Sequence, residues 1–150
     1  MTDAMATRSS GRITFVLIST LSLAGVIVSA VSLQRHFAKS DTAFCDFNKK
    51  FSCDVVNRSE QSSIIGIPVA GIGVAGYALL FLLSTFWKAR ADTPNRLLGA
   101  AIAGLAFALY LTYVEAYVLE TWCILCLGSL AIIFSISVLT IVGKLRYCRA

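Results

Sequence analysis

Charged residues leave four long gaps in this 150-residue chain. The uncharged stretches cover residues 13–34, 61–87, 97–114 and 121–143. A helix that crosses a lipid bilayer needs about 20 predominantly apolar residues, with a range of about 17–25, and every stretch meets that length. The composition agrees, since 57% of the residues are hydrophobic and only 14% are charged, whereas about a quarter are charged in a soluble domain. A soluble enzyme and a disordered chain are therefore disfavoured.

We expect an all-α integral membrane protein whose four transmembrane helices form a bundle. Backbone groups inside lipid must form hydrogen bonds within their own segment, so helices are the simplest way to cross. The helices are predicted at about 13–33, 67–87, 97–119 and 122–142, within a single membrane domain of residues 1–150, and a long exoplasmic loop at about 34–66 joins the first two. The net charge of +5 does not indicate a nucleic-acid partner, because the basic residues are neither clustered nor interleaved with aromatic residues.

The distribution of basic residues predicts the orientation in the membrane. With four spans, both termini and the loop at 88–96 lie on one side. That side carries two acidic residues, Asp3 and Asp92, against the basic residues Arg8, Arg12, Lys88, Arg90, Arg96, Lys144, Arg146 and Arg149. Because cytoplasmic loops are enriched in Lys and Arg, we expect both termini in the cytoplasm. An alternative is that Val28-Ser29-Ala30 ends a cleaved signal peptide, although the apolar run is longer than a usual signal core.

Four of the five cysteines fall on the predicted exoplasmic side, where disulfides persist. Cys45 and Cys53 lie in the long loop, and Cys123 and Cys126 form a Cys-x-x-Cys motif at the start of the fourth helix. A thiol near a helix N-terminus has a lowered pKa, which favours the reactive thiolate. Two such pairs on one membrane face suggest a relay. One pair would exchange with a soluble partner and the other with an electron carrier in the membrane.

Two other interpretations of these cysteines stay open. In the first, they are the ligands of a metal-handling membrane protein, although the separation of Cys45 and Cys53 is not the spacing usual for zinc. In the second, both pairs are structural disulfides in a non-catalytic membrane module. A bond between Cys123 and Cys126 would close a very short loop, however, and would stabilise the fold little. Cys148, in the basic tail, is expected to be a spectator thiol.

Three further features each have two interpretations. Small residues recur in the second and third predicted helices: Gly66, Ala70, Gly71, Gly73, Ala75, Gly76, Gly99, Ala103 and Gly104. They serve either close helix packing in lipid or a flat ligand between the helices. Glu115, near the exoplasmic end of the third helix, is either an interfacial carboxylate or a group that handles protons. His36, the only histidine, is expected to be a solvated interface residue rather than a ligand.

Several short motifs follow one another in a distinctive order. They are Phe44-Cys45-Asp46, Phe51-Ser52-Cys53-Asp54-Val55-Val56, Ser59, Gly66-Ile67-Pro68-Val69, Gly76-Tyr77, Tyr110-Leu111, Glu115 and Trp122-Cys123-Ile124-Leu125-Cys126. This combination resembles the vitamin K epoxide reductase family, and most of all its bacterial branch. The motifs extend from about Cys45 to Leu130. The number of predicted helices extends the likeness to nearly the whole chain.

The resemblance implies a four-helix quinone oxidoreductase of the bacterial cytoplasmic (inner) membrane that supports disulfide bond formation in exported proteins. In such a protein Cys45 and Cys53 accept electrons from a thioredoxin-like thiol oxidase, Cys53 exchanges with Cys123, and Cys126 reacts with the quinone. Ser59 matches a hydroxyl position of the family that helps to position the quinone or a cysteine. The thioredoxin-like domain fused to many bacterial members is not found in this sequence, so a separate exoplasmic partner is implied.

The sequence departs from the animal members of that family at two places. Those enzymes bind the quinone oxygen through an asparagine and a tyrosine, and the corresponding positions here hold the apolar Val69 and Leu130. A plain quinone of the ubiquinone or menaquinone type is therefore expected, rather than vitamin K epoxide. The other known four-helix quinone reductase that forms disulfides has its Cys-x-x-Cys pair first and its separated pair second. The order is reversed here, which argues against that enzyme.

Overall fold

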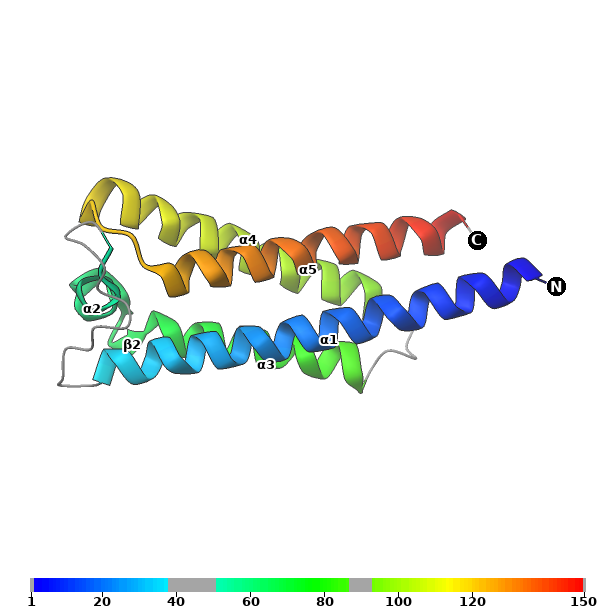
Figure 1. The fold of residues 1–150 in the computed structure, drawn as a ribbon, viewed down its shortest axis with the longest axis horizontal. Helices are drawn as coiled ribbons and strands as arrows, with labels where there is room; N and C mark the ends of the chain where they lie inside the picture. Colours follow the sequence, from blue (N-terminus) through cyan, green and yellow to red (C-terminus); the bar gives the residue numbers. More distant parts are fainter. Residues whose placement is uncertain (1, 38–50, 87–92, 150) are drawn as a thin grey trace.

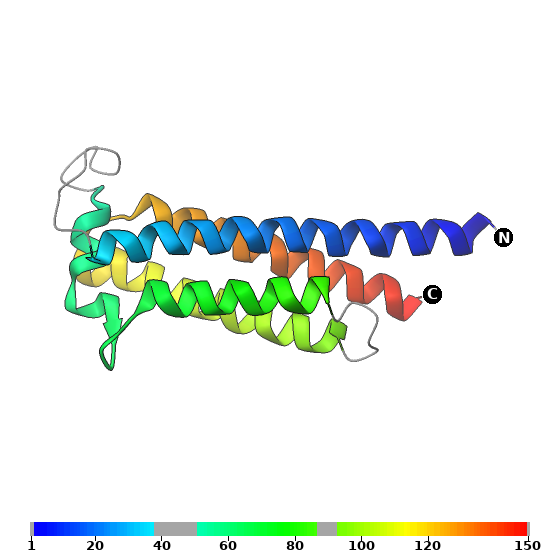
Figure 2. The same ribbon diagram turned by 90° about the horizontal axis from the view of Figure 1, so that it is seen from below.

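The first uncharged stretch lies inside one continuous helix, α1 (Thr2–Phe37), in the computed structural model, which describes residues 2–37, 51–86 and 93–149. Three more long helices follow: α3 (Val69–Thr85), α4 (Thr93–Val114) and α5 (Ile124–Arg149). The four helices run side by side along the molecule (Figures 1 and 2). The fold is therefore mostly helical, as the uncharged stretches predict.

Three helical segments are long and apolar enough to cross a membrane: Arg12–Phe37, Pro94–Leu119 and Ile124–Leu145. The helix expected at 67–87 is observed as α3, an apolar helix of 17 residues that falls short of the other three. It starts later than predicted because Ile67–Pro68 forms a strand, β2, and Pro68 is the N-terminal cap of α3 with extended backbone angles. A proline lacks the N–H that a helix interior needs and so marks a boundary.

The other predicted helix bounds also shift. Helix α1 extends beyond 13–33 at both ends, because neither flank contains a proline that would break it. The α-helical part of α4 ends at Val114 and passes into a π-helical turn, η2 (Glu115–Leu119). Helix α5 begins at Ile124 rather than at residue 122. It also continues past the predicted end at 142 to Arg149.

The predicted loop at 34–66 contains short elements in its described part. Helix α2 (Cys53–Arg58) is followed by a 3₁₀ turn, η1 (Glu60–Ser62), and by strand β1 (Ser63–Ile64), which pairs antiparallel with β2. Ile65 and Gly66 connect the two strands, and both have positive φ angles, 54° and 79°. Two positive φ angles in a two-residue hairpin loop are typical of a type I′ turn. Figure 1 shows α2 at the end of the bundle opposite the two termini.

The helices pack through an apolar core that is supplemented by hydrogen bonds between hydroxyl groups. The buried core residues are Ile18, Tyr77, Leu80, Leu83, Leu97, Ala101, Ile133 and Ile136. Ser19 on α1 shares hydrogen bonds with Ser84 (3.1 Å) and Thr85 (2.6 Å) on α3. Many large apolar side chains, including Ile13, Val16 and Ile27 on α1, point outward and are more than half exposed. Small and hydroxyl residues between helices, with apolar residues outside, are typical of packing in lipid.

Candidate active site

Cys53 is held at the start of α2. Ser52 caps this helix, and its hydroxyl accepts a hydrogen bond from the Val55 N–H at 3.3 Å. Just before the cap, Phe51 pairs with Trp122 in an isolated parallel β-bridge. This bridge brings the segment before α2 against the segment before α5. The first residue of α2 therefore lies beside the Cys-x-x-Cys motif, although the two are far apart in the sequence.

Cys123 and Cys126 are placed by the first turn of α5. The Cys123 carbonyl accepts the Leu127 N–H at 3.0 Å, so Cys123 stands at the N-terminal cap position. Its own N–H donates to the Glu115 carboxylate oxygen Oε2 at 3.1 Å. Cys126 follows one turn later. Both residues are thiols in this structure.

Cys53, Cys123 and Cys126 meet in one small cluster. Cys53 and Cys123 are buried, with exposed fractions of 1% and 0%, and Leu119, Leu125 and Cys126 pack against them. The side chain of Cys123 is hydrogen-bonded to those of both Cys126 and Cys53. The cluster therefore joins one loop cysteine directly to the Cys-x-x-Cys pair.

The acidity expected at a helix N-terminus is not observed for Cys123, which lies just outside the span Ile124–Leu145. The hydrogen bond to Cys126 raises the pKa of the Cys123 thiol, burial raises it further, and the contact with Cys53 lowers it only in part. When a thiol that donates to a neighbouring sulfur ionises, that hydrogen bond is lost, and an apolar environment disfavours the resulting charge. Both effects raise the pKa of the thiol. For Cys123 the prediction of a lowered pKa is therefore wrong.

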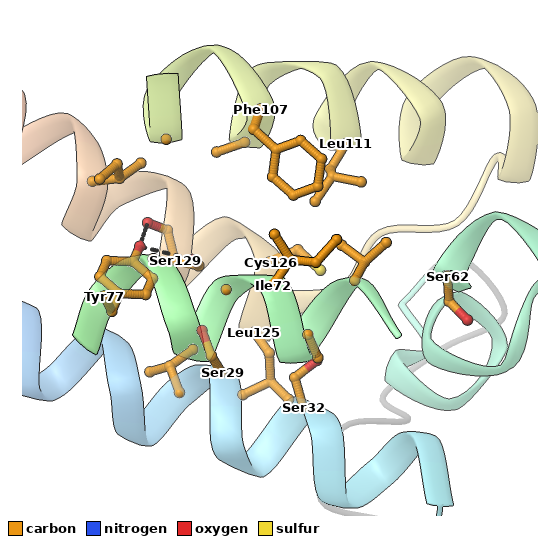
Figure 3. A pocket seen from close by; sticks show the side chains of 18 of the residues that line it. Ser29, Ser32, Ser62, Ile72, Tyr77, Phe107, Leu111, Leu125, Cys126 and Ser129 are labelled. Atoms are coloured by element: carbon orange, nitrogen blue, oxygen red, sulfur yellow. Dashed lines mark hydrogen bonds between the residues drawn. The ribbon is translucent and has the colours of Figure 1, made fainter. Parts of the chain in front are cut away.

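A cavity of about 400 Å³ lies between the helices and reaches the cysteine cluster. Figure 3 shows Phe107 and Leu111 of α4 on one side and Ser29 and Ser32 of α1 on the other. Cys126 lies between these two sides. The remaining wall includes residues of α3 and, at the cluster end, Val56, Ser59, Ser62, Glu115 and Leu119. The cavity lining is mostly apolar, and ligand pockets commonly have volumes of about 300–1,000 Å³.

Small residues make room for this cavity. Gly73, Gly76, Ala100, Ala103 and Gly104 are part of its wall. A Cβ atom at Gly76 would meet nothing within 4 Å, whereas one at Gly104 would lie 3.1 Å from the Ile133 side chain. The small residues therefore differ in what their positions allow. Some allow close packing, and others leave space between the helices.

The polar groups of the cavity are few and lie at separate points. At one end the Tyr77 hydroxyl donates to the Ser129 carbonyl at 2.8 Å and lies 2.9 Å from the Ser129 hydroxyl (Figure 3). At the other end, the Ser62 hydroxyl lies 3.3 Å from Nδ1 of His36. His36 is half-buried and contributes to the cavity wall, a placement that the expectation of a solvated interface residue did not include. A lone histidine gives no signal of this in the sequence, because Ser62 is brought to it by tertiary folding.

The remaining predicted site residues have different outcomes. Cys45 lies outside the described residues, as does the side chain of Cys148. Ser59 forms part of the cavity wall, and its hydroxyl donates to the Val56 carbonyl at 2.8 Å. Val69, at one of the positions that differ from the animal enzymes, also lines the cavity. On α5, the hydroxyl group in the cavity wall is that of Ser129. Within the described ranges no group of three or more His, Cys, Asp and Glu residues is arranged to hold a metal ion.

Glu115 is the residue whose surroundings the sequence predicted least well. It is 2% exposed, whereas an interfacial, solvated carboxylate was the simpler expectation. Its buried side chain lies in the cavity wall and contacts the Cys-x-x-Cys segment. The sequence signal was an ionisable residue close to the end of an apolar stretch. The identity of its partners depends on the π-helical turn and could not be inferred from spacing.

The chain was compared with protein families. The family described as the vitamin K epoxide reductase family matches residues 16–141, which is most of the chain.

Proposed function

The chain belongs to the vitamin K epoxide reductase family, a family of membrane oxidoreductases, and on this premise we propose that it is a quinone-dependent thiol–disulfide oxidoreductase. Electrons enter at Cys45 and Cys53 from a thioredoxin-like partner, pass to Cys123 and Cys126, and leave to a membrane quinone. The observation that carries the proposal is the junction at Cys123. Its side chain is hydrogen-bonded to both Cys53 and Cys126, and Cys126 lies in the wall of the apolar cavity.

The exchange between the pairs proceeds through a mixed disulfide. With Cys123 and Cys126 oxidised, the Cys53 sulfur attacks Sγ of Cys123 and releases Cys126 as a thiol. Cys45 then attacks Cys53, which re-forms the loop disulfide and releases Cys123. The contact between Cys53 and Cys123 supports this order of attack. Cys126, the sulfur that faces the cavity, is the one left to meet the electron acceptor.

The cavity fits a quinone ring in size and chemistry. A quinone supplies, when bound, an acceptor of two electrons and two protons. The apolar walls, with Phe107 and Leu111 among them, suit a flat ring. The side chains of Ser59 and Tyr77 also line the cavity, and each hydroxyl donates to a backbone carbonyl oxygen in this structure. To orient a quinone oxygen, either hydroxyl would have to exchange that carbonyl for the quinone. A ubiquinone- or menaquinone-type ring is proposed because Val69 offers no polar group where the animal enzymes have an amide.

The membrane arrangement completes the proposal. We infer that α3 crosses the bilayer as a fourth span beside the three longer ones, since it packs closely against α1. Both termini then lie in the cytoplasm, and α2 with the cysteine cluster lies on the exoplasmic side of a bacterial inner membrane. A soluble thioredoxin-like thiol oxidase would exchange with the loop pair there through Cys45, since Cys53 is buried. The reaction would maintain disulfide bond formation in exported proteins.

The test is quinone reduction by the purified full-length protein with two reductants, a reduced thioredoxin-like protein and a small dithiol. We expect Cys126→Ala to abolish turnover with both reductants. Cys53→Ala should abolish turnover with the protein donor and retain it with the small dithiol, which reaches the Cys-x-x-Cys pair through the half-buried Cys126. Cys148→Ala is the matched control and should behave as the parent.

Two results would contradict the relay. If Cys53→Ala and Cys126→Ala both reduce quinone as the parent does, the cysteines are structural. If the parent reduces no quinone with any donor, the chain keeps its family and fold but not the proposed chemistry.

A further inference from the structure

Glu115 is a buried titratable group that the electron route does not use. It stands at the start of the π-helical turn η2, is 2% exposed, and forms part of the cavity wall. Burying an ionised carboxylate is costly unless hydrogen bonds or charges compensate it. A side chain kept in this environment therefore needs partners, and their identity indicates what it can do.

Both partners of Glu115 belong to the Cys-x-x-Cys motif. Its Oε2 atom accepts the backbone N–H of Cys123 at 3.1 Å. Its carboxyl group is also hydrogen-bonded to the side chain of Cys126. The N–H groups at the start of α5 carry partial positive charge, which stabilises a carboxylate beside them. The carboxylate is thus held against the sulfur that faces the cavity.

The thiols and this carboxylate form a continuous series of hydrogen bonds. Cys53 contacts Cys123, Cys123 contacts Cys126, and Cys126 contacts Glu115. A thiol can both donate and accept, whereas an ionised carboxylate can only accept. The series therefore ends at Glu115, and the Cys126 S–H is the donor to it. When Glu115 is ionised, a proton that leaves Cys126 has an acceptor within hydrogen-bond reach.

We propose that Glu115 is a catalytic base and acid that takes the proton of Cys126 and delivers it across the cavity to the oxygen of the electron acceptor. The proposal rests on the quinone reduction proposed above. General bases act within hydrogen-bond reach of the proton they remove, and Glu115 meets that condition.

The electrons and protons balance as follows. Cys123 and Cys126 lose two electrons and two protons, and one S–S bond forms between them. The two electrons pass to a quinone-type acceptor, whose two oxygens receive two protons. Glu115 takes the proton of Cys126, gives it to the nearer oxygen, and is ionised again. The proton of Cys123 then moves along its hydrogen bond to Cys126 and on to the ionised Glu115, which releases it to solution, and the second oxygen takes one proton from solution. The thiols thus lose two protons, the acceptor gains two, and Glu115 is left ionised.

Two other titratable groups of the cavity wall have hydrogen-bond partners other than the cysteine cluster. Tyr77 on α3 is bonded to Ser129, and His36 on α1 meets Ser62. Among the side chains of α2 and α5 that the structure describes, the titratable groups hydrogen-bonded to Glu115 or to its partners are the three cysteines of the cluster. The described charged residues at this end of the bundle, Arg35, Glu60 and Glu120, are not part of the cavity wall.

The first experiment measures how fast Cys126 reacts with iodoacetamide in the reduced full-length protein between pH 6 and 8, with each cysteine followed by mass spectrometry. No quinone is needed. If Glu115 removes the thiol proton, the alkylation rate of Cys126 in the parent falls much less than tenfold for each unit by which the pH is lowered. In Glu115→Gln, which keeps an oxygen for the Cys123 N–H but cannot take a proton, the rate should fall about tenfold per unit. General bases contribute about 10²–10⁴-fold, so we expect at least a tenfold deficit at pH 6.

Glu120→Gln is the matched control, because Glu120 is an exposed carboxylate five residues farther on. It should have the pH profile of the parent. Glu115→Asp retains a carboxylate with a shorter reach and should recover part of the shallow profile. A purely structural Glu115 predicts equal slopes in the parent and in Glu115→Gln. That result, or a tenfold loss per unit in the parent itself, overturns the proposal.

Quinone turnover separates this proposal from the one it rests on. If the parent reduces quinone, Glu115→Gln should lower kcat with little change in KM, and the deficit should narrow as the pH rises because hydroxide replaces the missing base. Quinone reduction with identical alkylation slopes would leave the proposed function standing and exclude the role of Glu115. A parent with a shallow alkylation profile and no quinone reduction would contradict the proposed function alone.

Discussion

Cys123 and Cys126 are only three positions apart, yet their environments differ. Cys123 is fully buried, whereas Cys126 is half-buried and forms part of the cavity wall. The hydrogen bond to Cys126, and burial after it, raise the pKa of Cys123. A raised pKa keeps Cys123 protonated at the pH at which an ordinary thiol, with a pKa of about 8.5, begins to ionise. The buried, protonated sulfur of Cys123 therefore reacts slowly with electrophiles from solution, and its exchange with Cys53 is favoured.

This difference predicts how Cys123 responds when its neighbour is removed. In the reduced protein at pH 8, Cys123 should react slowly with iodoacetamide. Cys126→Ala removes the first cause of the raised pKa, and each unit by which the pKa falls raises the thiolate fraction about tenfold. We therefore expect the alkylation rate of Cys123 at pH 8 to rise about tenfold or more.

Leu125→Ala is the control for this measurement, because Leu125 packs against the same cluster without contributing a sulfur. It loosens the packing and leaves the hydrogen bond between Cys123 and Cys126. If Leu125→Ala accelerates alkylation as much as Cys126→Ala, burial rather than the hydrogen bond controls the acidity of Cys123.

At the scale of helices, α1 and α3 approach each other closely at Gly25. Gly25 of α1 lies directly under the ring of Tyr77, and a Cβ atom at this position would overlap the ring. The same tyrosine is bonded to Ser129 of α5. One glycine therefore allows a side chain of α3 to reach across the bundle and close the far end of the cavity.

Gly25→Ala should destabilise the protein, because Tyr77 must move and lose its hydrogen bonds to Ser129. Overpacking a tight contact costs about 1–3 kcal/mol, or a fall of roughly 2–12 °C in the unfolding midpoint for a chain of this length. The measurement is thermal unfolding of the purified protein in detergent.

Gly99→Ala is the matched substitution, since a Cβ atom there would meet nothing within 4 Å. Alanine stabilises a helix by about 1 kcal/mol over glycine, so Gly99→Ala should be neutral or stabilising. Equal midpoints for the two variants would mean that Gly25 and Tyr77 are not in close contact.

For the whole molecule, the sequence predicted the long helices better than their connections. Uncharged stretches locate the helices, because the cost of charge in lipid acts on every residue of a span. The bounds moved by several residues, as at Ile67–Pro68, where the strand β2 replaces the first predicted turn of α3. Local pairing and capping decide such positions, and hydropathy does not detect them.

The candidate site could be predicted only in part. Its cysteines were identifiable from spacing, but their convergence depends on the bridge between Phe51 and Trp122. The burial of Glu115 depends likewise on the π-helical turn. Both are long-range or irregular features that no periodic pattern encodes. Residues such as Glu115 and His36 therefore become understandable only when the helices are assembled.

The cavity itself predicts the effect of a bulkier residue in its wall. Gly76→Leu places a side chain into open space that belongs to the cavity, so the fold should persist while KM for the quinone rises about tenfold, equivalent to about 1.4 kcal/mol. Steady-state quinone reduction with the small dithiol measures this. Gly99→Leu adds the same side chain outside the cavity wall and should leave KM unchanged. An unchanged KM in Gly76→Leu would mean that the quinone binds elsewhere.

Both ends of the chain lie at the end of the bundle opposite α2 (Figure 1). Helix α5 alone has 26 residues, which is roughly 39 Å of helix between the cysteine cluster and the C-terminus. An affinity handle on either terminus is therefore separated from the reacting sulfurs by the length of the bundle. The protein can be tethered to a sensor surface by its N- or C-terminus with the thiols facing solution, and capture of a soluble redox partner can be followed without altering any loop.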